Sequence, residues 1–268
     1  MITQAIIPLA GLGTRMLPLT KVVPKELWPL GKLSILERIL FECEESGIEE
    51  IFLIISKKKN IIKTYFDKDT ALEKKVKNNP ELLKKLKLLT KYKKKIKFVY
   101  QNSAKGLGDA VNICKNKITS DHFLLILPDD IVINKNCSQE LINIYKKNKG
   151  SVIAIKKVKK NIVSRYGIVG YHKKINNVLS LDKLVEKPSV KESPSSFAII
   201  GRYILSKKIY KYLAKTKKGK LGEIQITDAM SMMLAGGESF KGCIFKGTYL
   251  DCGTIDGYIN SFNYIGYK

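Results

Sequence analysis

Histidine, tryptophan and closely spaced cysteines are scarce in this chain. Its 268 residues include two histidines, one tryptophan and five cysteines, none of which form a Cys-x-x-Cys pair. We therefore expect neither a histidine-based metal site nor a catalytic triad. The odd number of scattered cysteines is best interpreted as reduced thiols in a cytoplasmic protein.

Long apolar runs are also missing. No run reaches the length of a membrane span, and no basic segment followed by an apolar helix precedes the first predicted strand, so we expect no signal peptide and no membrane partner. A hydrophobic content of 44% is typical of a globular protein. The length suits one large α/β domain or two small ones.

Acidic residues are few, which leaves a formal charge of +25. Such a charge is compatible with nucleic-acid binding. However, the lysines are spread along the chain together with many isoleucines and asparagines, as a drift of the genome towards A and T would produce. No cluster of aromatic residues alternates with arginine. We therefore interpret the charge as compositional, although a positive field would help to attract phosphates.

Residues 5–15, with the sequence AIIPLAGLGTR, pass from a short apolar strand into a glycine loop that ends in a cation. Gly11 and Gly13 have no Cβ, so their backbone amides can approach an anion closely. Arg15 offers a planar fork of donors that matches phosphate oxygens. The order is typical of a sheet that presents a phosphate chain at its carboxyl edge, but an ordinary strand-to-helix turn fits about as well.

This loop differs from two common nucleotide motifs. It lacks the third glycine of a dinucleotide fingerprint and the Gly-Lys-Ser/Thr ending of a P-loop. The prolines in residues 18–30 exclude a helix interior there and predict a stiff extended loop. We interpret this loop as carrying Lys21 and Lys25 back towards the glycines, in preference to an ordinary surface connection.

Apolar strands and amphipathic helices alternate through the first half of the chain. After the first strand we expect a helix at 34–46, a strand at 51–55, a strand at 98–100, a helix opened by 106–110, a strand at 123–127, a helix around 141–145 and a strand at 152–158. This order predicts an α/β fold with a doubly wound, mostly parallel sheet. We interpret the lysine-rich residues 57–97 as surface helices, inserted between two core strands, whose charged side chains are solvated.

The pattern changes after residue 160. Short strands are expected at 167–171, 178–185, 197–205 and 248–250, with a helix that Thr227 or Asp228 caps and that ends before Gly236. No Ser/Gly linker separates this part from the first, so we expect a single domain over residues 1–268.

Two aspartates follow apolar strands more than a hundred positions apart. Asp129 and Asp251 each come where a strand should emerge at the ligand edge of a sheet. Two converging carboxylates together with phosphate oxygens make a magnesium site. An aspartate after a strand is also common in turns and helix caps, and for Asp129 alone the two interpretations are balanced. We take Asp130 as its neighbour and not as a ligand.

In these motifs the chain resembles the bacterial UTP–glucose-1-phosphate uridylyltransferases, a branch of the sugar-phosphate nucleotidyltransferases. The resemblance covers nearly the whole chain in collinear order. Its motifs are Gly-Leu-Gly-Thr-Arg at 11–15, Thr-Lys-x-x-Pro-Lys-Glu-x-x-Pro-Leu at 20–30, Tyr-Gln at 100–101, Gly-Leu-Gly at 106–108, Leu-Pro-Asp at 127–129, Tyr-Gly-Ile-Val at 166–169, Val-Glu-Lys-Pro at 185–188, Ala-Ile-Ile-Gly-Arg-Tyr at 198–203, Gly-Glu-Ile-Gln-Ile-Thr-Asp at 222–228 and Asp-Cys-Gly at 251–253.

The resemblance implies a Rossmann-like doubly wound mixed sheet, the nucleotide-diphospho-sugar transferase fold. It also implies a nucleotide-binding half (about 1–150) and a β-rich sugar-binding half (about 151–268). The implied reaction is the Mg²⁺-dependent conversion of UTP and glucose 1-phosphate to UDP-glucose and pyrophosphate. The implied residues are Arg15, Lys25 and Lys187 for catalysis, Ala10, Gly11, Gly13, Gln101 and Gly106 for the nucleotide, Gly167 and Glu186 for the sugar, and Asp129 and Asp251 for the metal.

Alternatives remain open at this point. A thymidylyltransferase acting on the same sugar phosphate is the nearest, but such relatives tend to carry Gly-Gly-x-Gly-Thr-Arg and Leu-Gly-Asp-Asn. A basic, non-catalytic nucleic-acid binder and an NAD-dependent oxidoreductase explain fewer of the motifs. The resemblance also implies a homo-oligomer, either a dimer or a tetramer. The chain ends soon after Tyr264, where relatives tend to continue as a helix, so this expectation is the less secure one.

Overall fold

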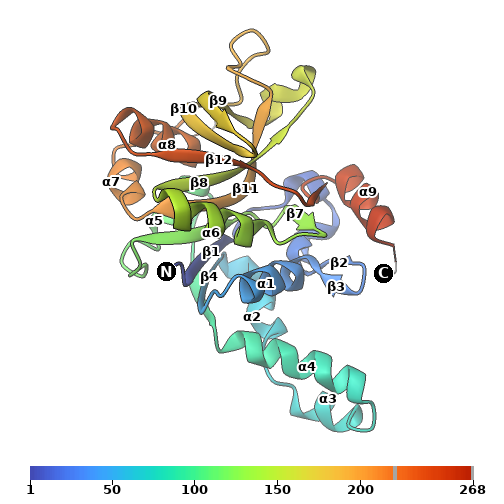
Figure 1. Ribbon diagram of the computed structural model, residues 1–268. Helices are drawn as coiled ribbons and strands as arrows, with labels where there is room; N and C mark the ends of the chain where they lie inside the picture. The colour runs from blue at the N-terminus through green and yellow to red at the C-terminus, as the bar shows by residue number, and fades with distance from the viewer. Residues whose placement is uncertain (220–221, 267–268) are drawn as a thin grey trace.

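Four apolar strands form the parallel part of the central sheet. They are β1 (Gln4–Pro8), β4 (Glu50–Ile55), β5 (Ile96–Tyr100) and β6 (His122–Ile126), in the spatial order β5-β4-β1-β6. Ile6 and Ile7 of β1 are both fully buried although they point to opposite faces. A parallel strand that is covered on both sides needs this continuous apolar sequence. The computed structural model describes residues 1–219 and 222–266 (Figure 1).

The second half of the chain extends the same sheet. Its strands are β8 (Ser151–Lys157), β9 (Gly167–Ile175), β10 (Val178–Glu186), β11 (Phe197–Ser206) and β12 (Phe240–Ile244). β11 pairs antiparallel with β6 on one side and with β8 on the other. The nine strands follow the order β5-β4-β1-β6-β11-β8-β12-β10-β9, so the expected doubly wound mixed sheet is confirmed.

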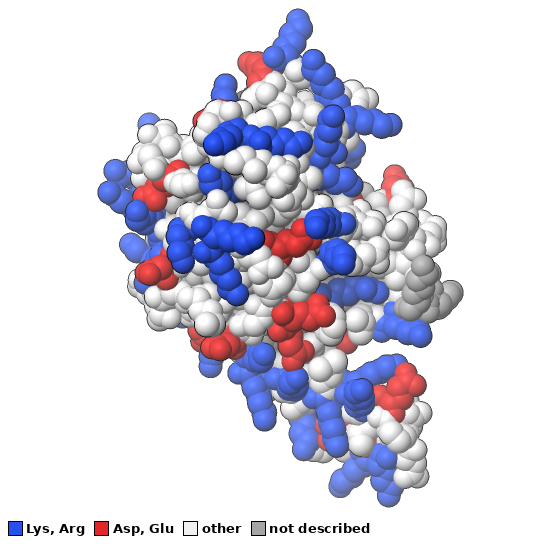
Figure 2. All heavy atoms as spheres, in the orientation of Figure 1, with Lys and Arg blue, Asp and Glu red and all other residues white. Residues whose placement is uncertain are grey.

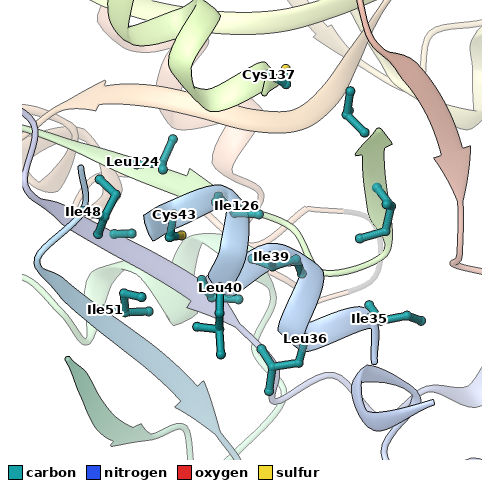
Figure 3. Close-up of a cluster of buried hydrophobic side chains, with 14 of the residues drawn as sticks. Ile35, Leu36, Ile39, Leu40, Cys43, Ile48, Ile51, Leu124, Ile126 and Cys137 are labelled. Carbon is teal, nitrogen blue, oxygen red and sulfur yellow. The ribbon is translucent and has the colours of Figure 1, made fainter. Parts of the chain in front are cut away.

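Helices cover both faces of the sheet. α1 (Ile35–Glu45) and α6 (Cys137–Asn148) pack on one face, and α5 (Leu107–Asn112), α7 (Ile209–Leu213) and α8 (Ile226–Ala235) pack on the other. Figure 3 shows the first face, where Ile39 and Leu40 of α1 lie close to Ile51, Leu124 and Ile126 of the strands. Side chains alternate along each strand, so two separate apolar layers result.

The start of α1 follows from its sequence. Ser34 accepts a hydrogen bond from the Glu37 amide, and the Glu37 carboxylate accepts one from the Ser34 amide at 2.7 Å. This reciprocal capping box satisfies two amides that the first helical turn leaves unpaired. Ile35, Leu36, Ile39, Leu40 and Cys43 then form the buried face, as the helical spacing predicted.

The lysine-rich insertion forms η4 (Lys57–Lys59), α2 (Ile61–Tyr65), α3 (Thr70–Lys75) and α4 (Pro80–Lys93). α3 and α4 project from the body as an arm (Figure 1), and most of their lysines are exposed, as expected. The expectation of a uniformly solvated charge run is wrong at Lys59, which is only 8% exposed. Within residues 1–219 and 222–266, every helix is too short or too polar to cross a bilayer.

Three details of the sequence analysis need correction. α8 begins at Ile226, with Gln225 at its N-cap, so neither Thr227 nor Asp228 caps it. Residues 18–30 are not a smooth extended loop, because η2 (Leu19–Lys21) and η3 (Lys25–Leu27) form single turns between the prolines. The sequence analysis also missed β7 (Asp130–Ile133), β12, α7 and α9 (Ile255–Ile265), and the short pair β2 (Pro29–Leu30) and β3 (Leu33–Ser34).

A buried ion pair joins these elements beneath the sheet edge. Arg202 of β11 is fully buried, and its Nη2 and Nε lie 2.9 Å and 3.0 Å from the carboxylate of Glu42 on α1. Glu42 also accepts from the amide of Ser138 at the start of α6. Nη1 of Arg202 donates to the Leu127 carbonyl at 3.2 Å. The guanidinium thus ties two helices to the chain segment that leaves β6.

We expect the Arg202→Met variant to lose stability. Removal of the guanidinium leaves the Glu42 carboxylate buried without a counter-charge, which typically costs about 3–5 kcal/mol of unfolding free energy. Urea denaturation followed by circular dichroism measures the loss. The control is Lys208→Met, which breaks the exposed Lys208–Glu238 pair and should leave the midpoint almost unchanged. Equal midpoints for the two variants would contradict the role given to Arg202.

Candidate functional site

The order of the parallel strands creates a crevice at one edge of the sheet. The chain runs from β1 to β4 and β5 on one side, and later returns to β6 on the other side of β1. The loops that leave the carboxyl ends of β1 and β6 therefore turn away from each other. Ligands bind at such a switch point in open α/β sheets. Residues 9–15 follow β1 and residues 127–129 follow β6.

A cleft of about 430 Å³ lies at this point. Its walls come from four segments that are far apart in the sequence. They are the glycine loop (Ala10, Gly11, Gly13, Arg15), the proline-rich loop (Lys25, Glu26), the segment around Gln101 and Gly106, and the end of β6 (Leu127, Pro128, Asp129), with Glu223 and Gly253 beside them. Eight of the residues selected from the sequence thus line one cleft.

Asp129 is the acidic centre of this cleft. Its Oδ2 lies 3.0 Å from Nζ of Lys25 and 3.4 Å from Nη2 of Arg15. Burial by itself would raise the pKa of Asp129, but the charge and hydrogen bond of Lys25, a backbone hydrogen bond and the charge of Arg15 together outweigh it and hold the pKa below its usual value. The carboxylate is therefore ionised at neutral pH, with two cations beside it.

Asp251 approaches Asp129 from the other end of the chain. β13 (Thr248–Asp251) pairs antiparallel with β7, and the Cys252 amide donates to the Asp129 carbonyl at 2.7 Å. A Cβ placed on Gly253 would lie 3.1 Å from Oδ1 of Asp251 and 3.2 Å from Oδ2 of Asp129. The two carboxylate oxygens are thus no farther apart than the sum of these distances. Both acids face one small space, and the glycine leaves that space open.

Asp130 has a different environment. One of its oxygens accepts from the Tyr249 hydroxyl at 2.6 Å, and the other accepts from the Gly201 amide at 2.9 Å. Burial, followed by the negative charge of Asp129, raises its pKa to about 6. Both of its oxygens accept hydrogen bonds from β11 and β13, so Asp130 links these strands and does not face the cleft. Of the two acids, Asp129 lines the cleft and Asp130 is not among its lining residues.

Gln101 lies at the far end of the cleft and is 7% exposed. Its amide nitrogen donates to the Asp109 carboxylate at 2.7 Å and to the Gly106 carbonyl at 3.3 Å. These two bonds fix the amide plane and leave the carbonyl oxygen as an acceptor. Gly106 has φ +96, and a Cβ there would lie 2.8 Å from the Ile224 carbonyl, so the tight turn needs glycine.

The residues predicted for the sugar form a second group on β9 and β10. Gly167 is paired with Glu186, and a Cβ on Gly167 would lie 3.1 Å from Oε2 of Glu186. Lys187 follows, half-exposed, with its Nζ 3.7 Å from Glu186. The pKa of the buried Tyr203 is raised first by burial and then by the charges of Asp130 and Glu186.

The side chains of the cleft suit a Mg²⁺ ion that also takes ligands from a substrate. They do not form a metal site in which the protein supplies every ligand. Within residues 1–219 and 222–266, no three His, Cys, Asp or Glu side chains are grouped to hold a metal ion. Asp129 and Asp251 each supply one carboxylate oxygen within 3.2 Å of a common point, the position of a Cβ built on Gly253. Mg²⁺ is usually bound in this way, through one or two carboxylates and the phosphates of a substrate.

Two features of the cleft were missed or misjudged in the sequence analysis. Lys21 lies exposed on η2 and does not line the cleft, whereas Lys25 does. Lys59 was taken as part of a solvated run, yet its Nζ lies 2.9 Å from both oxygens of the buried Glu26. Three consecutive lysines occur at 57–59, and no pattern in the sequence separates the buried one from the other two.

Comparison with known proteins finds relatives that match nearly the whole chain. Residues 4–266 match the family model described as Nucleotidyl transferase. The UTP–glucose-1-phosphate uridylyltransferase of Komagataeibacter xylinus is 36% identical over 94% of this chain and 89% of its own. A UDP-glucose pyrophosphorylase solved with UDP-glucose is 33% identical with a TM-score of 0.88, covering 98% of both chains. A UTP-bound enzyme of the same kind from Acinetobacter baumannii is 32% identical with a TM-score of 0.86, covering 99% and 94%.

We expect Lys25→Met to weaken the binding of a nucleoside triphosphate by roughly 10- to 100-fold, because one charge-assisted contact is lost and Asp129 loses its main counter-charge. Isothermal titration calorimetry measures the affinity. Lys21→Met is the matched control from the same loop and should bind as the wild type does. If the two variants bind equally well, Lys25 does not contact the phosphates.

Proposed function

The chain belongs to the nucleotidyl transferase family, among the UTP–glucose-1-phosphate uridylyltransferases, and we propose from this that it transfers UMP from UTP to glucose 1-phosphate. The products are UDP-glucose and pyrophosphate. The observation that carries the proposal is the convergence of Asp129 and Asp251 beside Lys25 and Arg15 at the switch point of the sheet. Structures of relatives with UTP and with UDP-glucose support the choice of substrates.

The uracil of UTP is assigned to the end of the cleft at Gln101 and Gly106. The free carbonyl oxygen of Gln101 can accept from the N–H of uracil, because its amide nitrogen is already held by Asp109. Ala10, Gly11 and Gly13 lie along the nucleoside. Within residues 1–219 and 222–266, nothing but Gly11 and its two chain neighbours lies within 4 Å of a Cβ built on Gly11, which leaves room for a ribose to lie against the backbone.

The phosphates are assigned to the end of the cleft at Arg15, Lys25, Asp129 and Asp251. The two aspartates hold Mg²⁺ in this proposal, and the ion, when bound, organises the phosphate oxygens and offsets the charge that develops on them. Arg15 and Lys25 stabilise the negative charge of the departing pyrophosphate. Lys25 lies on the proline-rich loop, and both cations lie beside Asp129. Their charges therefore need to move little during the reaction.

Glucose 1-phosphate is assigned to the β9–β10 edge. Glu186 accepts hydrogen bonds from sugar hydroxyls, and the Gly167 backbone contacts the ring. Lys187 neutralises the attacking phosphate, which would otherwise approach the triphosphate across uncompensated negative charge. A phosphate oxygen of the sugar attacks the α-phosphorus in line, and the bond to pyrophosphate breaks. Positioning and charge stabilisation supply most of the rate in such chemistry, and no covalent intermediate with the protein forms.

Two other functions fit the observations less well. A thymidylyltransferase would use the same architecture, but the relatives reported above are uridylyltransferases. A nucleic-acid binder would use a concentrated basic face, whereas Figure 2 shows Lys and Arg in several separate places from the top to the bottom of the side that it draws, with Asp and Glu between some of them. Nucleic-acid binding also gives no reason for two aspartates to converge.

The location and the assembly of the protein are also proposed. We assign the protein to the cytoplasm, where its substrates are made and where its five cysteines, all free and buried, stay reduced. We also propose that it forms a dimer or tetramer, as the family resemblance implies. Sedimentation velocity tests the assembly directly.

The proposed reaction is tested by incubating the protein with glucose 1-phosphate, Mg²⁺ and each nucleoside triphosphate in turn, and by measuring the pyrophosphate released. We expect UTP to be used far better than ATP, GTP or CTP. Turnover of dTTP in preference to UTP would assign the protein to the thymidylyltransferases. No pyrophosphate with any nucleotide would refute the enzymatic assignment.

We expect Asp251→Asn to raise the Mg²⁺ concentration needed for half-maximal turnover by at least roughly tenfold. Asparagine keeps the acceptor for the Gly253 amide, which donates to Oδ1 at 2.8 Å, but lacks the charge that binds the ion. Magnesium titration of the initial rate measures the shift. The control is Asp256→Asn, an exposed acid in the first turn of α9. An unchanged magnesium requirement in Asp251→Asn would remove this residue from the metal site.

A further inference from the structure

Lys59 forms a buried ion pair directly behind the phosphate end of the cleft. Its Nζ lies 2.9 Å from both carboxylate oxygens of Glu26. The two residues are 8% and 2% exposed, respectively. Breaking such a pair leaves an uncompensated charge in a poorly solvated place. The contact is therefore firm enough to fix the position of the segment that carries Glu26.

That segment also carries Lys25. Both residues belong to η3 (Lys25–Leu27), and both line the cleft. The Lys25 ammonium lies 3.0 Å from Oδ2 of Asp129, while the Glu26 carboxylate is held by Lys59. Two neighbouring carboxylates thus have separate cations, and the pairing leaves Lys25 directed at Asp129 and at the space where phosphates would lie.

Lys59 takes its own position from the central sheet. It ends η4 (Lys57–Lys59), which follows the central strand β4 after one residue, and its amide donates to the Ser56 carbonyl at 2.9 Å. The adjacent Lys57 and Lys58 are exposed. The ion pair with Glu26 therefore anchors the proline-rich loop to the end of β4. Without it, that loop consists only of short turns between prolines.

We propose that Lys59 is a positioning residue for the transfer reaction. It neutralises Glu26 so that this carboxylate neither captures the Lys25 ammonium nor repels the triphosphate. Lys59 acts through Glu26 and Lys25 and does not touch the substrate. The inference deepens the proposed function and rests on it for its effect on turnover, whereas the pairing of Lys25 is a property of the protein without substrate.

The test compares crystal structures and kinetics of Lys59→Met with those of the wild type. In the variant we expect Nζ of Lys25 to leave Asp129 and to pair with Glu26. We also expect kcat to fall roughly 10- to 100-fold at saturating UTP and Mg²⁺, because displacement of a catalytic group by about 1 Å has effects of this size. Lys58→Met, from the same turn, is the matched control and should keep both the contact and the rate.

The double variant Glu26→Gln/Lys59→Met separates positioning from support of the fold. It buries no unpaired charge, so it folds even if Lys59→Met does not. We expect Lys25 to remain on Asp129 in the double variant and kcat to recover most of what Lys59→Met loses. A role in stability alone would instead lower the melting temperature of Lys59→Met and leave the kcat of the folded enzyme unchanged.

The outcomes separate this inference from the proposed function. Lys25 still paired with Asp129 in Lys59→Met, with wild-type kcat, would overturn the inference and leave the function intact. A double variant that keeps Lys25 away from Asp129 would overturn it as well. Wild-type protein that releases no pyrophosphate from any triphosphate would refute the proposed function. In that case the position of Lys25 in crystals of the variant would be the only test of the inference.

Discussion

The buried pair of Arg202 and Glu42 is the constraint on which the site depends. Arg202 comes from β11, which pairs antiparallel with β6 on one side and with β8 on the other, and Glu42 comes from α1. The same guanidinium bonds the Leu127 carbonyl, two residues before Asp129. Burial would lower the pKa of Arg202, but the charge of Glu42 raises it overall, so the cation persists inside the protein. One interaction thus sets the direction in which the chain leaves β6.

Two acids at the cleft, Glu26 and Asp129, are paired with different cations. Lys59 holds Glu26, while Lys25 and Arg15 lie beside Asp129. Asp251 enters from the last strand, and Gly253 keeps the space between the acids open. Fixed charges of this kind stabilise a transition state better than mobile ones, because they need no reorganisation during the reaction. The fold supplies this rigidity through strands and ion pairs and not through loop packing alone.

Local patterns predicted most of the central sheet, whereas the residues at the nucleotide end of the cleft were named from the family resemblance. The apolar runs of β4 and β6 and the capped face of α1 carry their periodicity in the sequence, so residues such as Ile51 and Ile39 could be placed without coordinates. The short strands β7 and β12 have no such pattern, because their pairing depends on distant partners. Lys59 could not be separated from Lys58, since burial of one lysine among three is decided by Glu26, 33 positions earlier. The strand ends led us to expect Asp129 and Asp251 at the same edge of the sheet, but the position of Gly253 beside both carboxylates could be known only from the geometry.

The central claim is that Asp129 and Asp251 act on a single divalent cation at the phosphate end of the cleft. Crystals grown with Mn²⁺ and a non-hydrolysable UTP analogue test this most directly, because Mn²⁺ gives an anomalous signal and prefers the same oxygen ligands as Mg²⁺. The account predicts one anomalous peak within bonding distance of both carboxylates and of the analogue's phosphates. A peak bonded to neither aspartate, or to phosphates far from Lys25 and Arg15, would contradict it.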